Sequence, residues 1–250
     1  MLEVRFELDL ASGPMKLCAH LPNRPVSLCD LAELARSVCD QIVQTTRRHR
    51  DHQMRGQAVP CRRGCSVCCH FLVPLSVPEA LDLDNRLADL PPHRRRKVEQ
   101  SLDTAARRVL GAWGEADTGK MTVESLSQWY SGLQLPCPFL TKQSCSIYPH
   151  RPLACREHLA IGEKVPQGHA ATCPGRSLVA PPTSVLDVLA TLTAELEGKP
   201  LESVVLPLAP YWAEANRSRG LRTYPARKVL ERFVDILRHR THARVDASAA

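Results

Sequence analysis

Apolar residues recur every three to four positions along much of the chain, which is the spacing of one face of an α-helix. The clearest example begins after Ser27, a residue type that favours helix N-termini, and reaches about residue 50. It ends in a basic run, which suits the negative end of a helix dipole. The pattern predicts an amphipathic helix whose buried positions include Leu31, Leu34, Ala35, Val38 and Ile42.

Further helices are predicted from the same periodicity and from residues that start helices. Ser76 and Glu79 form a capping-box pattern with an early proline between them, so a helix should begin there and run to about residue 90. Ser184 and Asp187 indicate another helix start. We expect the tail from Thr241 to be disordered. The other predicted helices cover a basic segment that ends near Trp113, residues 122–133, residues 184–197 and a last amphipathic segment around residues 229–237.

One segment has the alternation of a strand. Polar and apolar residues alternate over residues 3–10, which predicts a half-buried strand. Aromatic residues are only 4% of the chain, which favours packed helices over a β-sandwich. We therefore predict a mainly α protein, with short helices packed around an irregular, metal-stapled cysteine-rich centre and one N-terminal strand. The predicted divisions are an N-terminal strand and helix (1–55), a cysteine-cluster metal-binding domain (56–178) and a C-terminal helical region with a disordered tail (179–250).

The overall composition is that of a soluble globular protein, with 250 residues, 44% hydrophobic and 24% charged. No apolar run reaches the roughly 18 residues of a membrane span, and the first ten residues lack the apolar core of a signal peptide. We therefore expect a cytoplasmic protein without a membrane partner. In that reducing compartment, 11 cysteines indicate metal or redox chemistry rather than disulfides.

The net charge is positive, because 33 Lys and Arg residues outnumber 26 Asp and Glu residues by 7. Metal-bound cysteines are thiolates, so part of this charge can neutralise an anionic metal centre. The basic segments lack interleaved aromatic residues and a zinc-finger order of Cys and His, so we expect solvated helix faces and no nucleic-acid partner. The sequence also contains no P-loop, GxGxxG, GxSxG or HExxH motif.

The cysteines that carry the strongest chemical signal fall into two groups. The first group, within nine residues, is Cys61, Cys65, Cys68 and Cys69. The second group is Cys137, Cys145, Cys155 and Cys173. Spacings of two or three residues let neighbouring thiolates reach one metal centre. We therefore expect all eight to be metal ligands and to converge in space. We expect the remaining cysteines to lie apart from them as core thiols; these are Cys18, Cys29 and Cys39.

The type of metal centre is judged from the ligand pattern. Thiolates suit both zinc and iron–sulfur clusters. The side chains of the adjacent residues Cys68 and Cys69 diverge, so they suit one polynuclear cluster or two neighbouring centres better than one tetrahedral zinc that is also bound by Cys65. We therefore favour an iron–sulfur cluster of the [4Fe–4S] type, with zinc as the alternative.

The first three cysteines have a spacing that also occurs in radical S-adenosylmethionine enzymes, where one iron stays open for that cofactor. The strand–helix alternation of those enzymes does not follow here. S-adenosylmethionine bound to an open iron on another fold therefore remains a candidate cofactor.

Several short motifs follow one another between residues 58 and 175. They are Cys61-x3-Cys65-x2-Cys68-Cys69, Cys137-Pro138-Phe139-Leu140, Cys145-Ser146-Ile147-Tyr148, Arg151-Pro152 and Cys155-Arg156. This arrangement resembles the YkgJ-type cysteine-cluster family, which is described as a zinc- or iron-chelating domain. The family includes a branch similar to flagellin lysine N-methylases, which use S-adenosylmethionine. The resemblance implies a cofactor class rather than a defined reaction.

Basic and aromatic residues accompany the ligands. The arginines that flank them are cofactor-binding candidates that would neutralise an anionic metal centre, or else recognise an anionic substrate; they are Arg62, Arg63, Arg151 and Arg156. His70 and His158 are further candidates for ligands or proton donors, and Tyr148 is expected to pack over the centre and exclude water.

The sequence as a whole predicts a metal-binding protein with a structural, redox or sensing role, whose partner is a protein substrate or a redox protein. The alternatives are an enzyme similar to the S-adenosylmethionine-dependent protein lysine N-methylases and a structural zinc module. No residue is identified as catalytic.

Overall fold

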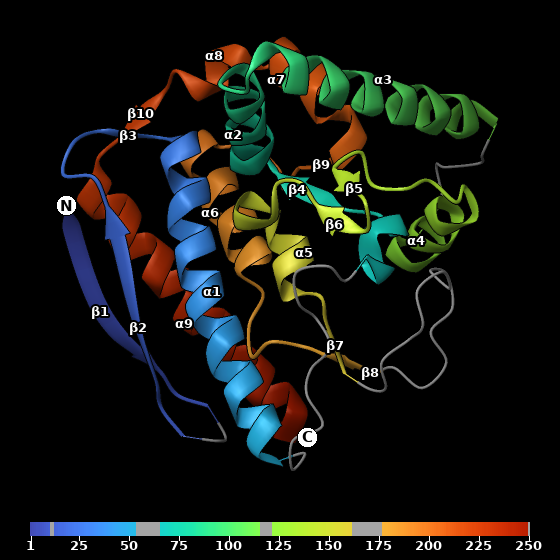
Figure 1. Cartoon of the computed structure of the whole chain (residues 1–250). Coiled ribbons are helices and arrows are strands. Elements are labelled where there is room, and N and C mark those ends of the chain that lie inside the picture. The colour runs from blue at the N-terminus through green and yellow to red at the C-terminus, as the bar shows by residue number, and fades with distance from the viewer. Residues whose placement is uncertain (11–12, 54–65, 116–121, 162–176, 250) are drawn as a thin grey trace.

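The computed structural model describes residues 1–10, 13–53, 66–115, 122–161 and 177–249, and it shows a mainly α protein (Figure 1). The helices are α1 (Leu28–Gln53), α2 (Val77–Ala88), α3 (Pro92–Glu115), α4 (Val123–Gly132), α5 (Leu153–Glu157), α6 (Val185–Glu197), α7 (Ala209–Ala215), α8 (Arg217–Gly220) and α9 (Ala226–Ala249). The predicted fold class is confirmed.

The strands of the described residues form small antiparallel pairs. They are β1 (Leu2–Leu8) with β2 (Met15–Leu21), β3 (Val26–Ser27) with β10 (Thr223–Tyr224), β4 (Pro74–Ser76) with β9 (Ser203–Val205), β5 (Leu140–Thr141) with β6 (Ser144–Cys145), and β7 (Leu159–Ile161) with β8 (Ser177–Val179). Two of these pairs join distant parts of the chain: β3 with β10 and β4 with β9.

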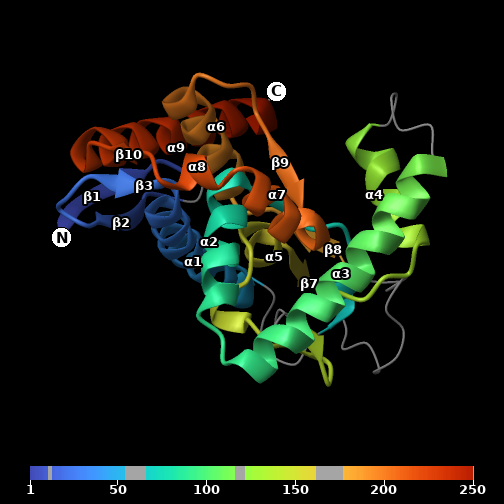
Figure 2. The same cartoon turned by 90° about the horizontal axis from the view of Figure 1, so that it is seen from above.

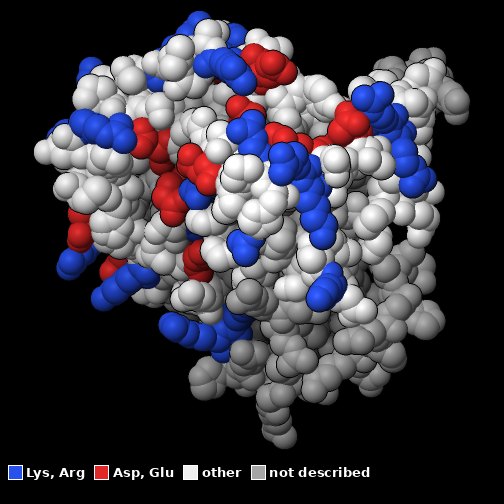
Figure 3. Space-filling view, turned by 45° about the horizontal axis from the view of Figure 1, so that its top comes forward, with Lys and Arg blue, Asp and Glu red and all other residues white. Residues whose placement is uncertain are grey.

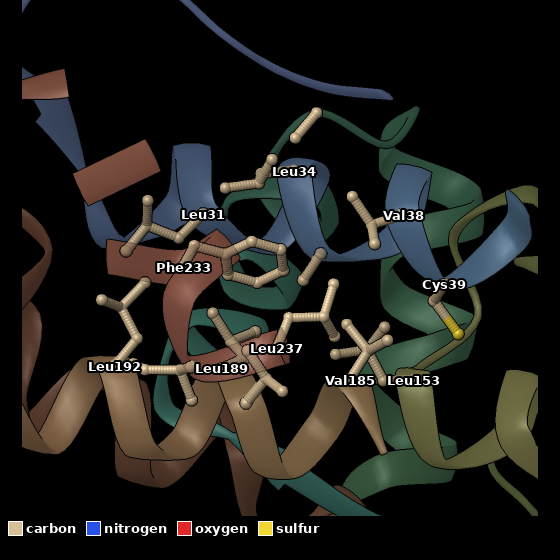
Figure 4. Close-up of a cluster of buried hydrophobic side chains, with 14 of the residues drawn as sticks. Leu31, Leu34, Val38, Cys39, Leu153, Val185, Leu189, Leu192, Phe233 and Leu237 are labelled. Carbon is tan, nitrogen blue, oxygen red and sulfur yellow. The ribbon is translucent and has the colours of Figure 1, made fainter. Parts of the chain in front are cut away.

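The main hydrophobic core lies where α1, α6 and α9 pack together, with α5 at its edge (Figure 4). Phe233 of α9 is fully buried between Leu31 and Leu34 of α1 on one side and Leu189 of α6 on the other. The β1–β2 hairpin covers α1 and α9 and adds its own apolar face to this core. The core therefore joins the beginning, the middle and the end of the chain.

The hairpin corrects the prediction of a single N-terminal strand. Residues Met15–Leu21 form a second strand, in register with the first from Leu2 opposite Leu21 to Leu8 opposite Met15. Its apolar positions are buried and the residues between them are more exposed, which is the alternation of a strand with one covered face. That alternation is easy to miss because Cys18 and Ala19 interrupt the contrast between polar and large apolar residues.

Three of the helices are long, whereas the prediction was of short helices. Helix α1 has 26 residues, and α3 and α9 have 24 each. Helix α9 continues past Thr241, where we expect a disordered tail, to Ala249. Thr241 is buried, and its hydroxyl donates to the carbonyl of Leu237 at 2.8 Å, so the helix itself satisfies this polar group.

The predicted helix starts agree with the structure. At α2, the backbone N–H and the hydroxyl of Ser76 both donate to the carboxylate of Glu79, at 3.0 and 2.9 Å. At α6, the backbone N–H of Asp187 donates to the hydroxyl of Ser184 at 3.2 Å. Side chains therefore satisfy polar groups at both helix ends, as helix capping requires.

Helices α3 and α4 extend away from the main core (Figure 2). They pack on each other through a small cluster that contains Val109, Tyr130 and Leu135. The rings of Trp113 and Trp129 meet edge to face, with centroids 5.4 Å apart.

No helix in the described ranges has the length and apolar character to cross a membrane. On the face shown in Figure 3, acidic side chains lie among the Lys and Arg side chains.

A buried ion-pair network joins α1 to α2. Arg36 of α1 is 4% exposed, and its guanidinium donates to the carboxylate of Asp82 in α2 at 2.7 Å. Arg86 donates to the same carboxylate at 2.7 Å and to Glu33 at 3.1 Å. The charge of Asp82 therefore compensates two arginines at the contact between the helices.

We expect Asp82→Ala to lower the free energy of unfolding by about 3 kcal/mol, because it leaves the buried charge of Arg36 without its main partner. Urea denaturation followed by circular dichroism measures the change. Asp84→Ala, on the same helix, is the control and should cost about 0.5 kcal/mol. Equal small losses in both variants would show that the network does not hold α1 and α2 together.

Candidate metal centre

Two segments carry the cysteines that the structure describes in the predicted cluster. A short 3-10 helix, η1 (Val67–His70), carries Cys68 and Cys69. The second segment includes Cys137, the β5–β6 hairpin with Cys145, and α5 with Cys155. In Figure 1, β5, β6 and α5 lie between α1 and α6 on one side and α4 on the other.

The β5–β6 hairpin turns through Lys142 and Gln143, whose φ angles are 46° and 61°. Positive φ at both central residues of a two-residue loop is typical of the tight turn that fits the twist of a hairpin. The turn returns the chain so that Cys145 lies opposite Leu140. The backbone N–H of Ser146 then donates to the carbonyl of Phe139 at 2.9 Å. The hairpin thereby fixes where Cys145 stands relative to Cys137.

A backbone hydrogen bond joins the two segments directly. The N–H of Cys137 donates to the carbonyl of Cys69 at 2.6 Å. Phe139 is 1% exposed and packs in a second hydrophobic cluster with Leu75, Leu102 and Leu206. A hydrogen bond therefore joins the two cysteine-bearing segments to each other, and apolar packing of Phe139 attaches them to the rest of the fold.

The thiols of this region surround one cavity with a volume of about 60 Å³. A water molecule needs roughly 10–15 Å³ of such space, so the cavity can hold a small inorganic group. Its lining residues are Cys68, Cys69, Val73, Cys137, Phe139, Cys145, Ile147, Tyr148, Arg151, Pro152, Cys155, His158 and Leu206. The structure thus brings together five of the eight predicted ligands; the others, Cys61, Cys65 and Cys173, lie outside the described residues, as do Arg62 and Arg63.

The thiols influence one another electrostatically. Burial raises the pKa of Cys137 to about 11 and also raises the pKa of Cys145. The pKa of Cys155 is raised by burial and further by the neighbouring thiols. The pKa of Cys68 is raised first by its hydrogen bond with the thiol of Cys69 and then by burial. Ionising several of these thiols together therefore requires a compensating cation, and a metal ion or cluster supplies that charge.

Arg151 and Arg156 have different surroundings. Arg151 lines the cavity, and its guanidinium lies over the ring of Tyr148 at 4.5 Å. The Nε atom of Arg151 is buried and has no hydrogen-bond partner within the described part of the chain. A buried, unpartnered cationic donor beside a thiol-lined cavity fits an anionic metal–thiolate group there.

Arg156 is not among the residues that line the cavity, and its side chain bonds to other protein groups. Its side chain is 5% exposed and forms an ion pair with Asp40 of α1. It also donates to the carbonyls of Pro149 and Arg151, at 2.5 and 2.9 Å. Arg156 therefore holds the loop before α5 against α1. The sequence grouped it with Arg151, since both flank cysteines, and only the folded geometry separates their surroundings.

Of the two candidate histidines, His158 lines the cavity, whereas the lining does not include His70. Burial lowers the pKa of His158, so its imidazole is neutral at pH 7. Its ring meets Phe71 edge to face, with centroids 5.6 Å apart. Val73 and Leu206 also line the cavity, although no sequence motif marks them, and Leu206 comes from a remote part of the chain.

The three other cysteines lie away from this cavity. Cys39 is 1% exposed in the main core, as predicted (Figure 4). Cys29 is half-buried, packs against that core and accepts a hydrogen bond from the amide of Asn85 at 3.3 Å. Cys18 corrects the prediction of a core thiol, because it lies on the more exposed face of β2, where its sulfur contacts His20.

Comparison with known proteins adds one finding. Residues 60–174 match the family model CxxCxxCC, described as a "putative zinc- or iron-chelating domain". The match covers nearly the same segment as the cysteine-cluster resemblance and includes the five cysteines that line the cavity. Neither a curated protein nor a solved structure matches the chain.

Glu79 connects the helical frame to the cysteine segment. This buried carboxylate accepts from both groups of Ser76 at the start of α2, and also from the N–H of Leu153 at the start of α5, at 2.7 Å. Burial raises the pKa of Glu79, and these hydrogen bonds oppose the rise. Since Leu153 lies two residues before Cys155, Glu79 sets the position of one predicted ligand.

We expect Glu79→Gln to reduce both stability and metal content. The amide nitrogen cannot accept a hydrogen bond, so a buried donor loses its partner at a cost of about 1–3 kcal/mol. Thermal denaturation and elemental analysis of the same preparation measure the two effects. Glu99→Gln, at an exposed ion pair in α3, is the control and should change neither. Full metal content in Glu79→Gln would contradict a positioning role.

Proposed function

We propose that the thiol-lined cavity holds an iron–sulfur cluster with a structural and redox role, on the premise that residues 60–174 match the family model of a zinc- or iron-chelating domain. The family description supports zinc or iron, and the choice of iron–sulfur rests on the ligand arrangement. The observation that carries it is the meeting of the adjacent residues Cys68 and Cys69 with Cys137, Cys145 and Cys155 around a single cavity.

The residues of the cavity have distinct parts in this proposal. The cysteines supply thiolates to the cluster, and Arg151 opposes the resulting negative charge with its unpartnered Nε. Phe139 and Ile147 limit access of water to the cavity. The guanidinium of Arg151 stacks over the ring of Tyr148. When bound, an iron–sulfur cluster supplies one-electron chemistry, with a potential that depends on burial and on nearby charge.

The size of the cavity favours a cofactor-holding role over a catalytic one. Pockets for organic ligands occupy about 300–1,000 Å³. The cavity has about 60 Å³, which is space for the inorganic group alone. This supports a module whose cluster fastens the cysteine segments and exchanges electrons.

We expect protein purified without oxygen to be brown and to contain iron and acid-labile sulfide in comparable amounts, because sulfur-to-iron charge transfer absorbs visible light. Dithionite should bleach part of the absorption. S-adenosylmethionine should leave the electron paramagnetic resonance signal of the reduced cluster unchanged, since the proposed cluster has a cysteine ligand on every iron. A changed signal would instead favour the open-iron enzyme. Colourless protein with near-integer zinc and no sulfide would refute the iron–sulfur proposal.

We expect Cys155→Ser to lower iron content and thermal stability together, because binding of a structural metal can contribute on the order of 10 kcal/mol to folding. Cys39→Ser is the matched control: this thiol is also buried, but it lies in the main core. It should retain the iron and lose only about 1–2 kcal/mol of stability. The same iron loss in both variants would argue against Cys155 as a ligand.

A further inference from the structure

Three metal-binding side chains meet on the β1–β2 hairpin, outside the segment that matches the family. The sulfur of Cys18 lies 3.4 Å from Nε2 of His20, and the same nitrogen lies 3.3 Å from Oε2 of Glu3. These three ligand atoms all lie within 4.8 Å of one another. The arrangement is therefore a compact Cys–His–Glu group with mixed sulfur, nitrogen and oxygen donors.

The strand register explains why these residues meet. Cys18 and His20 are two positions apart on β2, so their side chains share one face. Glu3 is directly opposite His20, and Arg5 is directly opposite Cys18. The backbone N–H and C=O of Cys18 bond to Gln41, so they point away from β1. Both facing pairs are therefore of the non-hydrogen-bonded kind, in which opposite side chains stand closest.

Helix α1 holds this part of the strand in place. The amide of Gln41 accepts from the N–H of Cys18 at 2.9 Å and donates to its carbonyl at 2.7 Å. On the opposite face, Leu17, Ala19 and Leu21 are buried in the main core. Two of the three donors thus project from a strand segment that is fixed on its edge and on its inner face, which preorganises them.

From this geometry we propose that Glu3, Cys18 and His20 form a second metal site, which binds zinc. Zinc bonds of 2.0–2.3 Å in a tetrahedron place neighbouring S, N and O ligands roughly 3.3–3.6 Å apart. The observed separations of 3.3 and 3.4 Å match that geometry before any movement of the side chains. Three protein ligands leave the fourth position to water, as in zinc sites that are open to solvent.

Arg5 is the cation nearest to this group, and it acts on Glu3. Its Nε donates to Oε1 of Glu3 at 2.6 Å and leaves Oε2 directed at His20. Arg5 also lowers the pKa of Glu3, which keeps that carboxylate ionised. Burial and Glu3 raise the pKa of Cys18, so zinc must displace its proton, and binding should release it. Arg5 is therefore placed to orient Glu3 through Oε1, which leaves Oε2 of Glu3 to bind the metal.

Zinc titration of the full-length protein tests the proposal. The protein, with its central centre intact, is treated briefly with a chelator and then titrated with Zn²⁺ against a colorimetric competitor at micromolar concentration. Cys18→Ser removes the thiol at a half-exposed position without changing the size of the side chain much. Cys29→Ser is the matched control, because Cys29 is also half-buried but stands outside the group.

The wild type should bind one more equivalent of zinc than Cys18→Ser, and Cys29→Ser should bind as the wild type does. His20→Gln should lower the affinity for this additional zinc at least about tenfold. Even the loss of a group that only orients a ligand lowers metal affinity roughly 10–100-fold. Equal zinc stoichiometry and affinity in the wild type and Cys18→Ser would overturn the site. Because the variants are compared on the same background, this result does not depend on which metal fills the central cavity.

Discussion

The carboxylate of Glu79 is the constraint on which the arrangement of the central cysteines depends. One oxygen completes the N-terminal cap of α2, and the other accepts from the backbone N–H of Leu153 at the start of α5. Helix α2 is itself tied to α1 through Asp82 and Arg36. Polar contacts of buried side chains therefore link the position of Cys155 to helices α1 and α2.

The surroundings of the thiols that line the cavity oppose their ionisation. In the described part of the chain, the wall of the cavity combines apolar side chains with Arg151, and burial raises the pKa of thiols that line it, such as Cys137 and Cys155. A cavity of this kind is costly to charge without a metal, and it binds one strongly because each thiolate gains a cation at short range. Arg156 contributes indirectly, since it holds the loop before α5 against Asp40 instead of meeting the cavity.

The parts of the fold that could be predicted from the sequence are those whose cause is local. The capping box at Ser76 and Glu79 and the start of α6 at Ser184 follow from side chains three residues apart, and the structure has both. The same holds for the amphipathic face of α1, whose periodic apolar residues are buried. The two groups of cysteines distinguished in the sequence also supply the five thiols that line the cavity in the described part of the chain.

Features that arise from tertiary contacts were not accessible in this way. The strand β2 was missed, because its alternation becomes clear only when it pairs with β1 and covers the core. The continuation of α9 past Thr241 depends on burial of that residue against its neighbours. The wider role of Glu79, which reaches a backbone group 74 positions away, leaves no trace in local spacing. The prediction that Cys18 is a core thiol is wrong for the same reason. Its place beside His20 and Glu3 depends on the register between β1 and β2, which local spacing does not reveal.

The central claim is that thiols from two distant segments share one polynuclear centre. X-ray absorption at the iron edge of the anaerobically purified protein tests it most directly, because this measurement reports the atoms around each metal. We predict a first shell of sulfur and a second shell that contains iron, as a cluster requires. A signal at the zinc edge with a sulfur shell and no neighbouring metal atom, in protein that lacks iron, would contradict the account.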